Sequence, residues 1–271
     1  MDLRSEIAVV PGGAGGPALA YADRGPRSGA AVVLLHSLGT DHRIWRPQLD
    51  ALASRHRVVA ADSRGHGGSG WRPGLSIDGW VDDLTRLLDH AGVRTATLVG
   101  LSMGGIQALG FALRHPDRTA GLILADTFAE LAPDAARAKI AAMSGAASEL
   151  GMRAYADRYV ADTFTSAPPV ADAEVVREAI AAMALEPYLA SVRTCFGARL
   201  ASRLPEVTAP ALVLWGERDA KTPRELSERL AAGIPGASLR ALPDAGHLSS
   251  LENPKAFLDA VDQHLDSLSV P

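Results

Sequence analysis

Short, continuously apolar segments recur along the chain, and each is followed by a glycine-containing or polar turn and then by a helical pattern. The clearest segments are residues 31–35, 58–61, 97–99, 122–125 and 211–215. Strands that are apolar on both faces are typical of a parallel sheet covered by helices on each side. The pattern therefore predicts an α/β fold with a mostly parallel sheet flanked by helices.

The first strand-like residues have a different pattern. Residues 5–24 contain two weaker strand patterns separated by PGGAGGP. Glycine and proline in this arrangement favour a turn between two antiparallel strands. We expect a hairpin at the edge of the sheet.

A long segment without strand patterns interrupts the series. Between residues 128 and 205 the chain is dominated by alanine-rich helical patterns such as AARAKIAAMSGAASEL. Strand patterns flank this segment on both sides, so we expect a helical cap inserted late in the sheet and lying over the strand ends. The predicted core domain then consists of residues 1–127 and 206–271, and the predicted cap of residues 128–205.

The composition narrows the class of protein. A chain of 271 residues with 47% hydrophobic residues can bury one large core. The formal net charge of −4 and the lack of a Lys/Arg cluster argue against a nucleic-acid partner. The start of the sequence lacks a signal-peptide pattern, and no stretch approaches the roughly 20 apolar residues of a membrane span. We expect a cytoplasmic protein that does not bind membranes; its oligomeric state is not predicted.

The segment GLSMG, centred on Ser102, has the form G-x-S-x-G. A strand pattern precedes it and a helical pattern, GGIQALGFALRHP, comes after it. A serine on a tight turn between a strand and a helix projects from the carboxyl end of the sheet, where α/β proteins hold their ligands. Ser102 is therefore a candidate nucleophile, although the pentapeptide alone also fits a small residue in a tight turn.

A serine nucleophile requires a base and a group that orients the base. Among eight histidines, His247 follows a strand-like segment and lies in a glycine-containing loop, from which it could reach Ser102. Asp219 follows the strand pattern that ends in WGERD. Asp126 also follows a strand pattern and is an alternative acid, but we favour Asp219. The order Ser102, Asp219, His247 is the chain order of an α/β-hydrolase triad.

A tetrahedral intermediate also needs N–H donors for its negative oxygen. Met103, the residue after the nucleophile, supplies one predicted donor. Leu38, in the glycine-containing turn HSLG after the first long strand pattern, is predicted to supply the other. We interpret His36, at the start of that turn, as a structural residue that braces neighbouring loops.

Five segments in the same order resemble the α/β-hydrolase superfamily over nearly the whole chain. They are LLHSLGT, ADSRGHGGS, GLSMGG, ALVLWGERDAKTP and AGHLSSLENPKAF. Within the superfamily, three segments together look most like the 3-oxoadipate enol-lactonases and related small esterases. They are HSLGTDHRIWRPQLDAL, SRGHGGSG and GLSMGG. The resemblance implies the α/β-hydrolase fold and a serine hydrolase that cleaves a small carboxylic ester or lactone through an acyl-enzyme.

Two other functions remain open on the sequence. A perhydrolase or acyltransferase of the same fold would pass the acyl group to peroxide or an alcohol in place of water. A ligand-binding module could keep the hydrolase fold with little turnover. The three possibilities share a small-molecule ligand and differ in the fate of that ligand once it is bound.

No cofactor or metal is predicted. In ADSRGHGGS, one histidine and one aspartate without further spaced ligands make a poor zinc site, and the glycines match neither nucleotide-binding fingerprint. In the family that the chain resembles, this segment is a structural turn whose Arg and His tie loops together. The single cysteine, Cys195, rules out an internal disulfide and is interpreted as a buried thiol without a reaction.

Substrate contacts are expected in the cap. A lactone that carries a carboxylate needs a cation in an apolar pocket, and a guanidinium donates two parallel hydrogen bonds to a carboxylate. At least one cap arginine is predicted to make this contact, and Arg193, which follows an apolar helix face, is the first choice. The other cap arginines are Arg137, Arg153, Arg158, Arg177 and Arg199. Trp45, in the segment that resembles the enol-lactonases, is also predicted to bind substrate.

Overall fold

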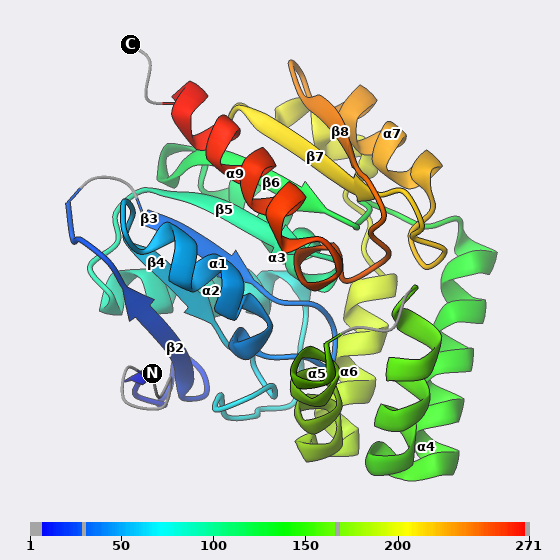
Figure 1. Cartoon of the computed structure of the whole chain (residues 1–271). Helices are drawn as coiled ribbons and strands as arrows, with labels where there is room; N and C mark the ends of the chain where they lie inside the picture. Colours follow the sequence, from blue (N-terminus) through cyan, green and yellow to red (C-terminus); the bar gives the residue numbers. More distant parts are fainter. Residues whose placement is uncertain (1–6, 29–30, 166–168, 269–271) are drawn as a thin grey trace.

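Eight strands form one sheet in the order β1-β2-β4-β3-β5-β6-β7-β8 (Figure 1). The protein is represented by a computed structural model that describes residues 7–28, 31–165 and 169–268. The strands are β1 (Ile7–Val10), β2 (Leu19–Arg24), β3 (Ala31–Leu35), β4 (Val58–Ala61), β5 (Ala96–Leu101), β6 (Thr119–Ala125), β7 (Ala211–Gly216) and β8 (Ser238–Leu242). The pairs from β4 through β8 are parallel. The predicted α/β fold with a mostly parallel sheet is confirmed.

The predicted hairpin is present at one edge of the sheet. β1 pairs antiparallel with β2, and β2 pairs antiparallel with β4. Residues 5 and 6, which the prediction included, lie outside the described residues. The hairpin therefore extends the parallel sheet on its β4 side.

The helices cover the sheet on both faces. Outside the segment between β6 and β7 they are α1 (Arg46–Leu52), α2 (Ile77–His90), α3 (Met103–Arg114), α7 (Arg224–Gly233), α8 (Ser249–Glu252) and α9 (Pro254–Leu268). Among the described residues, the short 3-10 helices are η2 (His42–Trp45), η3 (Pro116–Arg118) and η4 (Ala201–Glu206). In Figure 1, α1 and α9 lie in front of the sheet, and these two helices contact each other.

The direction of the crossovers explains the two layers. β4 lies on one side of β3, whereas β5 and β6 lie on the other side. Crossover connections between parallel strands are right-handed. When the chain adds its next strand on the other side of the sheet, the connecting helix therefore lies on the opposite face. The reversal places the carboxyl ends of β3 and β5 side by side at a switch point, which is where such sheets bind ligands.

Three helices, which we call the inserted helices, occupy the segment between β6 and β7. They are α4 (Pro133–Thr163), α5 (Val170–Ala182) and α6 (Leu185–Phe196). α4 is interrupted at Gly151, whose φ of 73° is unfavourable for other residues. The second half of α4 can therefore lie at a different angle from the first. Both halves contribute residues to one cavity.

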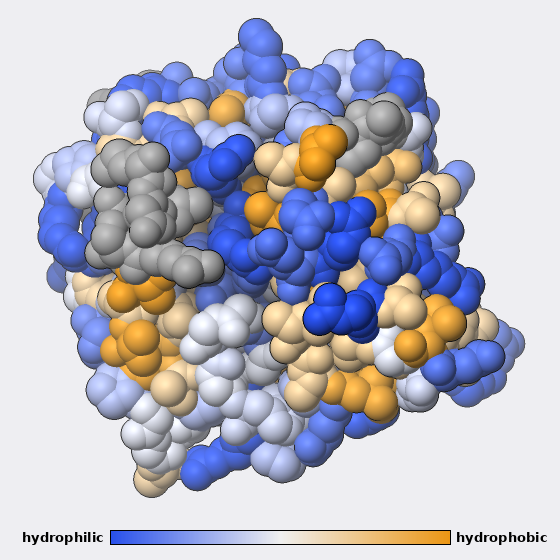
Figure 2. Space-filling model, turned by 60° about the horizontal axis from the view of Figure 1, so that its bottom comes forward, coloured by the Kyte–Doolittle hydropathy of each residue, from blue (hydrophilic) through white to orange (hydrophobic). Residues whose placement is uncertain are grey.

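The surface of the inserted helices is mixed in polarity. Figure 2 turns the lower face of Figure 1 forward and shows hydrophobic residues in separate groups among hydrophilic ones. Among the described residues, no helix has both the length and the apolar composition that crossing a bilayer would require.

Two buried histidines brace the loops at the switch point. His36 Nδ1 donates to the carbonyl oxygen of Ser37 at 2.8 Å, and His36 Nε2 accepts from the N–H of Ser63 at 3.0 Å. The ring of His66 lies 5.0 Å from that of His36, centroid to centroid. The bracing predicted for His36 is confirmed. In the same segment Arg64 donates to both carboxylate oxygens of Asp83, at 2.6 and 2.8 Å.

Both histidines are held in the neutral form. Burial lowers the pKa of His36. Burial, together with the repulsion that a protonated His36 would exert, lowers the pKa of His66 to about 3. An unfolded histidine titrates near pH 6.5, so below that pH the unfolded chain binds protons that the folded chain does not. This difference favours the unfolded state increasingly as the pH falls from about 6.5 toward 3.

We predict that replacing His66 by Gln makes stability less sensitive to acid. Between pH 6.5 and 5, the free energy of unfolding should fall less steeply in His66→Gln than in the wild type. The difference in slope should reach up to about 1.4 kcal/mol per pH unit. Urea unfolding at several pH values measures both slopes. Parallel slopes would contradict the assignment of His66 as a buried neutral histidine.

Candidate active site

Ser102 occupies a sharp turn between β5 and α3. Its φ of 54° and ψ of −113° lie in a region that side chains rarely adopt. The flanking glycines make the turn possible. A Cβ on Gly100 would lie 2.3 Å from the carbonyl oxygen of Gly104, and a Cβ on Gly104 would lie 2.0 Å from that of Leu35. The two glycines are therefore required by the close approach of β3, β5 and α3.

The end of β6 holds this turn in place. Ser102 N–H donates to the carbonyl oxygen of Ala125 at 2.9 Å, and Thr127 Oγ1 donates to the carbonyl oxygen of Ser102 at 2.7 Å. Both contacts are buried, where hydrogen bonds to the backbone are costly to lose. The strained backbone of Ser102 is thus fixed on both sides of its Cα.

His247 lies between Ser102 and Asp219. His247 Nε2 is 3.0 Å from Ser102 Oγ, and His247 Nδ1 is 2.9 Å from Asp219 Oδ2. All three side chains are buried. With Nδ1–H donating to the carboxylate, Nε2 is left as an acceptor for the serine hydroxyl. The structure brings together the three residues that the sequence predicted as a triad.

Asp219 is held as a carboxylate. Its Oδ1 accepts from the N–H groups of Lys221 and Thr222 at 2.7 and 3.0 Å, and its Oδ2 accepts from Thr222 Oγ1. Burial alone would raise the pKa of Asp219, but the charge of His247 and the hydrogen bonds from His247 and Thr222 outweigh it and lower the pKa. An ionised Asp219 can stabilise a positive charge on His247.

Asp126, the alternative acid, has other partners. Its Oδ1 accepts from Gly216 N–H at 2.8 Å, and its Oδ2 accepts from Ser249 Oγ. Burial and the nearby charge of Asp219 raise its pKa well above the usual value for a carboxyl group. Asp126 therefore links the strand that leads to Asp219 with the loop that carries His247. The hydrogen bond from His247 Nδ1–H is accepted by Asp219.

The two predicted oxyanion donors come from the turn after β3 and from the start of α3. Leu38 follows β3 and lines the same cavity as Ser102. Met103 is the first residue of α3, and the N–H groups of a helix's first turn have no partner within the helix. Backbone N–H groups at such positions can bind a negative oxygen.

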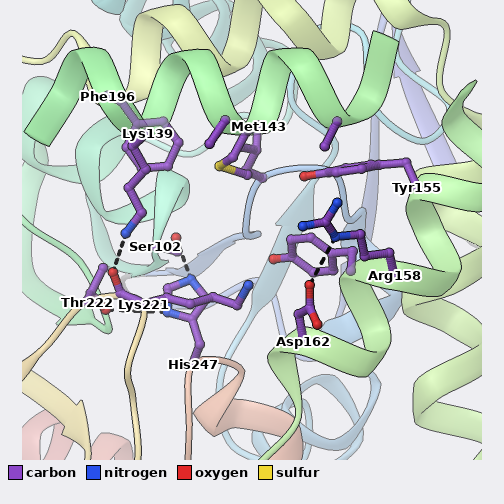
Figure 3. Close-up of a pocket in the computed structure, with 14 residues that line it drawn as sticks. Ser102, Lys139, Met143, Tyr155, Arg158, Asp162, Phe196, Lys221, Thr222 and His247 are labelled. Carbon is purple, nitrogen blue, oxygen red and sulfur yellow. Dashed lines mark hydrogen bonds and ion pairs between the residues drawn. The ribbon is translucent and has the colours of Figure 1, made fainter. Parts of the chain in front are cut away.

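Ser102 and His247 open into a cavity of about 250 Å³ (Figure 3). Its walls come from Leu38, from both halves of α4, from Phe196 of α6 and from the loop after Asp219. Met143 and Phe196 make part of the wall apolar, whereas Lys139 and Lys221 add positive charge. This volume suits a small ligand.

Two predicted substrate contacts are not supplied by the structure. Arg193 is exposed on α6 and is not among the residues that line the cavity. Trp45 is fully buried in the core, where its ring packs 5.8 Å from that of Phe257. Trp45 therefore stabilises the packing of η2 on α9. The prediction that Trp45 contacts substrate does not fit this buried position.

The cations at the cavity are Lys139, Arg158 and Lys221. Arg158 belongs to the set of cap arginines from which a substrate contact was predicted, whereas neither lysine was selected from the sequence. Lys221 could have been found from its position, because it lies two residues after Asp219 in the acid-bearing loop. Lys139 had no such signal, because the interruption at Gly151 decides how the two halves of α4 face the cavity.

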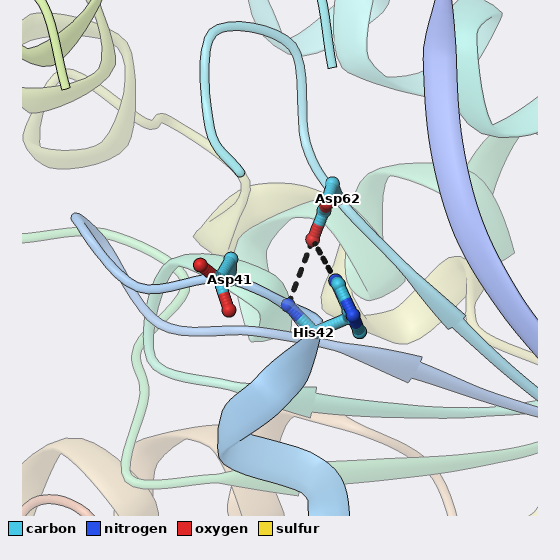
Figure 4. A group of neighbouring side chains, drawn as sticks. All are labelled: Asp41, His42 and Asp62. Carbon is cyan, nitrogen blue, oxygen red and sulfur yellow. Dashed lines mark hydrogen bonds and ion pairs between the residues drawn. The ribbon is translucent and has the colours of Figure 1, made fainter. Parts of the chain in front are cut away.

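One other cluster outside this cavity has metal-ligating side chains. Ligand atoms of Asp41, His42 and Asp62 lie within 4.8 Å of one another (Figure 4). His42 donates to Asp62 Oδ1 from both its backbone N and its Nδ1, each at 2.8 Å, and Arg43 donates to both carboxylate oxygens of Asp41. The protein itself satisfies these carboxylates, so the cluster is an ion-pair network that fixes the η2 turn.

The chain is similar to known hydrolases over most of its length. The chain is 33% identical over 264 residues to the putative carbamate hydrolase RutD of Variovorax paradoxus, with 93% of this chain and 98% of the relative covered. It is 30% identical over 252 residues to 3-oxoadipate enol-lactonase 2 of Acinetobacter baylyi, covering 90% and 92%. The crystal structure of the enol-lactonase from Burkholderia xenovorans superposes with a TM-score of 0.87 at 31% identity, covering 96% and 100%.

The match to a protein family spans most of the chain. Residues 32–260 match the model of the alpha/beta hydrolase family, a range that includes the inserted helices and every strand from β4 to β8. The predicted α/β-hydrolase fold and the resemblance to enol-lactonases are confirmed. The chain belongs to the alpha/beta hydrolase family.

Proposed function

We propose that the protein is a serine hydrolase that cleaves a small carboxylic ester, and in particular a lactone. The observation that carries this proposal is the hydrogen-bonded series from Ser102 Oγ through His247 to Asp219, with Ser102 and His247 lining a cavity. Similarity to two enol-lactonases supports the choice of a lactone.

The first half of the proposed reaction forms an acyl-enzyme. Ser102 Oγ attacks the carbonyl carbon while His247 Nε2 takes the hydroxyl proton, and Asp219 stabilises the resulting imidazolium. The N–H groups of Leu38 and Met103 bind the negative oxygen of the tetrahedral intermediate. The bond to the leaving oxygen then breaks, and His247 returns the proton to that oxygen.

The second half releases the acyl group to water. His247 takes a proton from a water molecule, which attacks the acyl carbon, and Ser102 leaves with the proton from His247. In a lactone the leaving oxygen stays attached to the acyl chain, so one ring-opened acid results. Product analysis in the presence of peroxide or alcohols distinguishes this hydrolase from a perhydrolase or acyltransferase of the same fold.

A carbamate is the second candidate substrate. The relative from Variovorax paradoxus is named as a putative carbamate hydrolase, and a carbamate carbonyl can be attacked by the same serine. The leaving group then determines which substrate is turned over. Parallel assays with a panel of lactones, short-chain esters and carbamates compare the two candidates.

We predict that Ser102→Ala abolishes turnover without unfolding the protein. Removing the nucleophile should lower kcat by about 10⁴-fold or more. The measurement is the hydrolysis rate of the best lactone or ester from the panel, with circular dichroism as the check on folding. A folded Ser102→Ala variant that keeps a rate near that of the wild type would rule out the serine mechanism.

We predict that replacing the two candidate acids by asparagine has very different effects on kcat. Asp219→Asn removes the charge that orients His247 and should lower kcat by about two to four orders of magnitude. Asp126→Asn keeps an oxygen for Gly216 N–H and gains an amide donor for Ser249, so its kcat should stay within about fivefold of the wild type. The opposite ranking in steady-state kinetics would assign the orienting role to Asp126.

A further inference from the structure

Two lysines line the cavity that holds Ser102. Lys139 projects from the first half of α4, and Lys221 belongs to the loop that carries Asp219 (Figure 3). Both side chains are half-buried. Within the described part of the chain, neither ammonium lies within ion-pair distance of a carboxylate, whereas Arg158 at the same cavity is 3.3 Å from Asp162.

The existing contacts of the two lysines leave hydrogen-bond donors available. Lys139 Nζ donates to the carbonyl oxygen of Lys221 and lies 5.6 Å from the centre of the Phe196 ring. Lys221 Nζ lies 4.8 Å from the centre of the Tyr159 ring. An aromatic face attracts a cation but satisfies its N–H groups only weakly, and each ammonium has three of them.

The electrostatics of the cavity favour an anion. Burial lowers the pKa of both lysines, and the charge of Lys139 lowers the pKa of Lys221 further. Asp219 acts in the opposite direction on both, and Asp162 does so on Lys221. Both carboxylates already have partners, since Asp219 is bound by His247 and Thr222 and Asp162 by Arg158. Two half-buried ammonium groups that repel each other are stabilised by a negative group placed between them.

The use of lysine at this cavity differs from the rest of the chain. Only three of the 27 Lys and Arg residues are lysines, namely Lys139, Lys221 and Lys255. Lys255 is exposed on α9 and pairs with Asp259 at 2.7 Å. A lysine ammonium is a compact, rotatable charge that can bind one oxygen of a small ligand without filling the space that a guanidinium occupies.

We propose that Lys139 and Lys221 form an anion-binding subsite for a carboxylate carried by the substrate. The subsite lies beside the reacting carbonyl, so the carboxylate belongs to a short acyl chain and selects a negatively charged ester or lactone over a neutral one. This proposal rests on ester hydrolysis by Ser102, and it replaces Arg193 as the source of the positive charge.

The test compares two esters that differ at the end of the acyl chain. Mono-p-nitrophenyl succinate ends in a carboxylate, and p-nitrophenyl butyrate ends in a methyl group. The readout is the ratio of their kcat/KM values, succinate over butyrate. This ratio is insensitive to partial unfolding, which lowers both values together.

In the wild type the ratio should be about a hundredfold, because each of the two lysines supplies a charge-assisted hydrogen bond that corresponds to about tenfold. Lys139→Gln and Lys221→Gln should each lower the ratio about tenfold, and the double variant should bring it to about one. Lys139→Arg and Lys221→Arg, which keep the charge, should retain most of the preference. Lys255→Gln is the matched control and should leave the ratio unchanged.

Two outcomes separate the subsite from the proposed function. If Ser102 is required for hydrolysis of both esters but the ratio is near one and unaffected by the lysine changes, the anion subsite is wrong and the hydrolase remains. If Ser102→Ala hydrolyses both esters at the wild-type rate, the proposed function itself fails. A ratio that falls equally in Lys255→Gln would show a general charge effect and would also overturn the subsite.

Discussion

The strained backbone at Ser102 is the constraint on which the site depends. A residue with a φ of 54° between a strand and a helix persists only when its surroundings over-determine it. Here the carbonyl oxygen of Leu35 approaches so closely that position 104 has no room for a Cβ. The sheet, the turn after β3 and the start of α3 are therefore packed as one unit, and that packing aims the serine side chain into the cavity.

The end of β6 connects this unit to the other two components of the site. Ala125 and Thr127 bind the backbone of Ser102, while Asp126 binds Gly216 and Ser249. Three consecutive residues thus fix the distances among the elbow, the acid loop and the histidine loop. A buried carboxyl group is expensive unless it is hydrogen-bonded or neutral, and the raised pKa of Asp126 reflects that cost. Asp126 positions Gly216 and Ser249 through its two hydrogen bonds.

Most of the fold could be predicted from the sequence because short segments of the chain determine where the strands, helices and turns lie. Continuous apolar runs indicate buried parallel strands, and the glycines around Ser102 indicate a turn that must pack closely. Asp219 and His247 could be selected because each follows a strand, and the carboxyl ends of parallel strands meet at one edge. The hydrophobic pattern also predicted the helical segment between β6 and β7, since alanine-rich sequence with a helical period strongly favours helices.

The substrate-facing walls were decided by tertiary structure. The sequence by itself determined that Ser102, Asp219 and His247 would reach one sheet edge, because strand order and turn chemistry fix those positions. It did not determine which side of each inserted helix faces the cavity, since that depends on the interruption of α4 at Gly151 and on how the helices pack against the core. Arg193 consequently faces solvent and Trp45 fills the core, while Lys139 and Lys221, far apart in the chain, lie together beside Ser102.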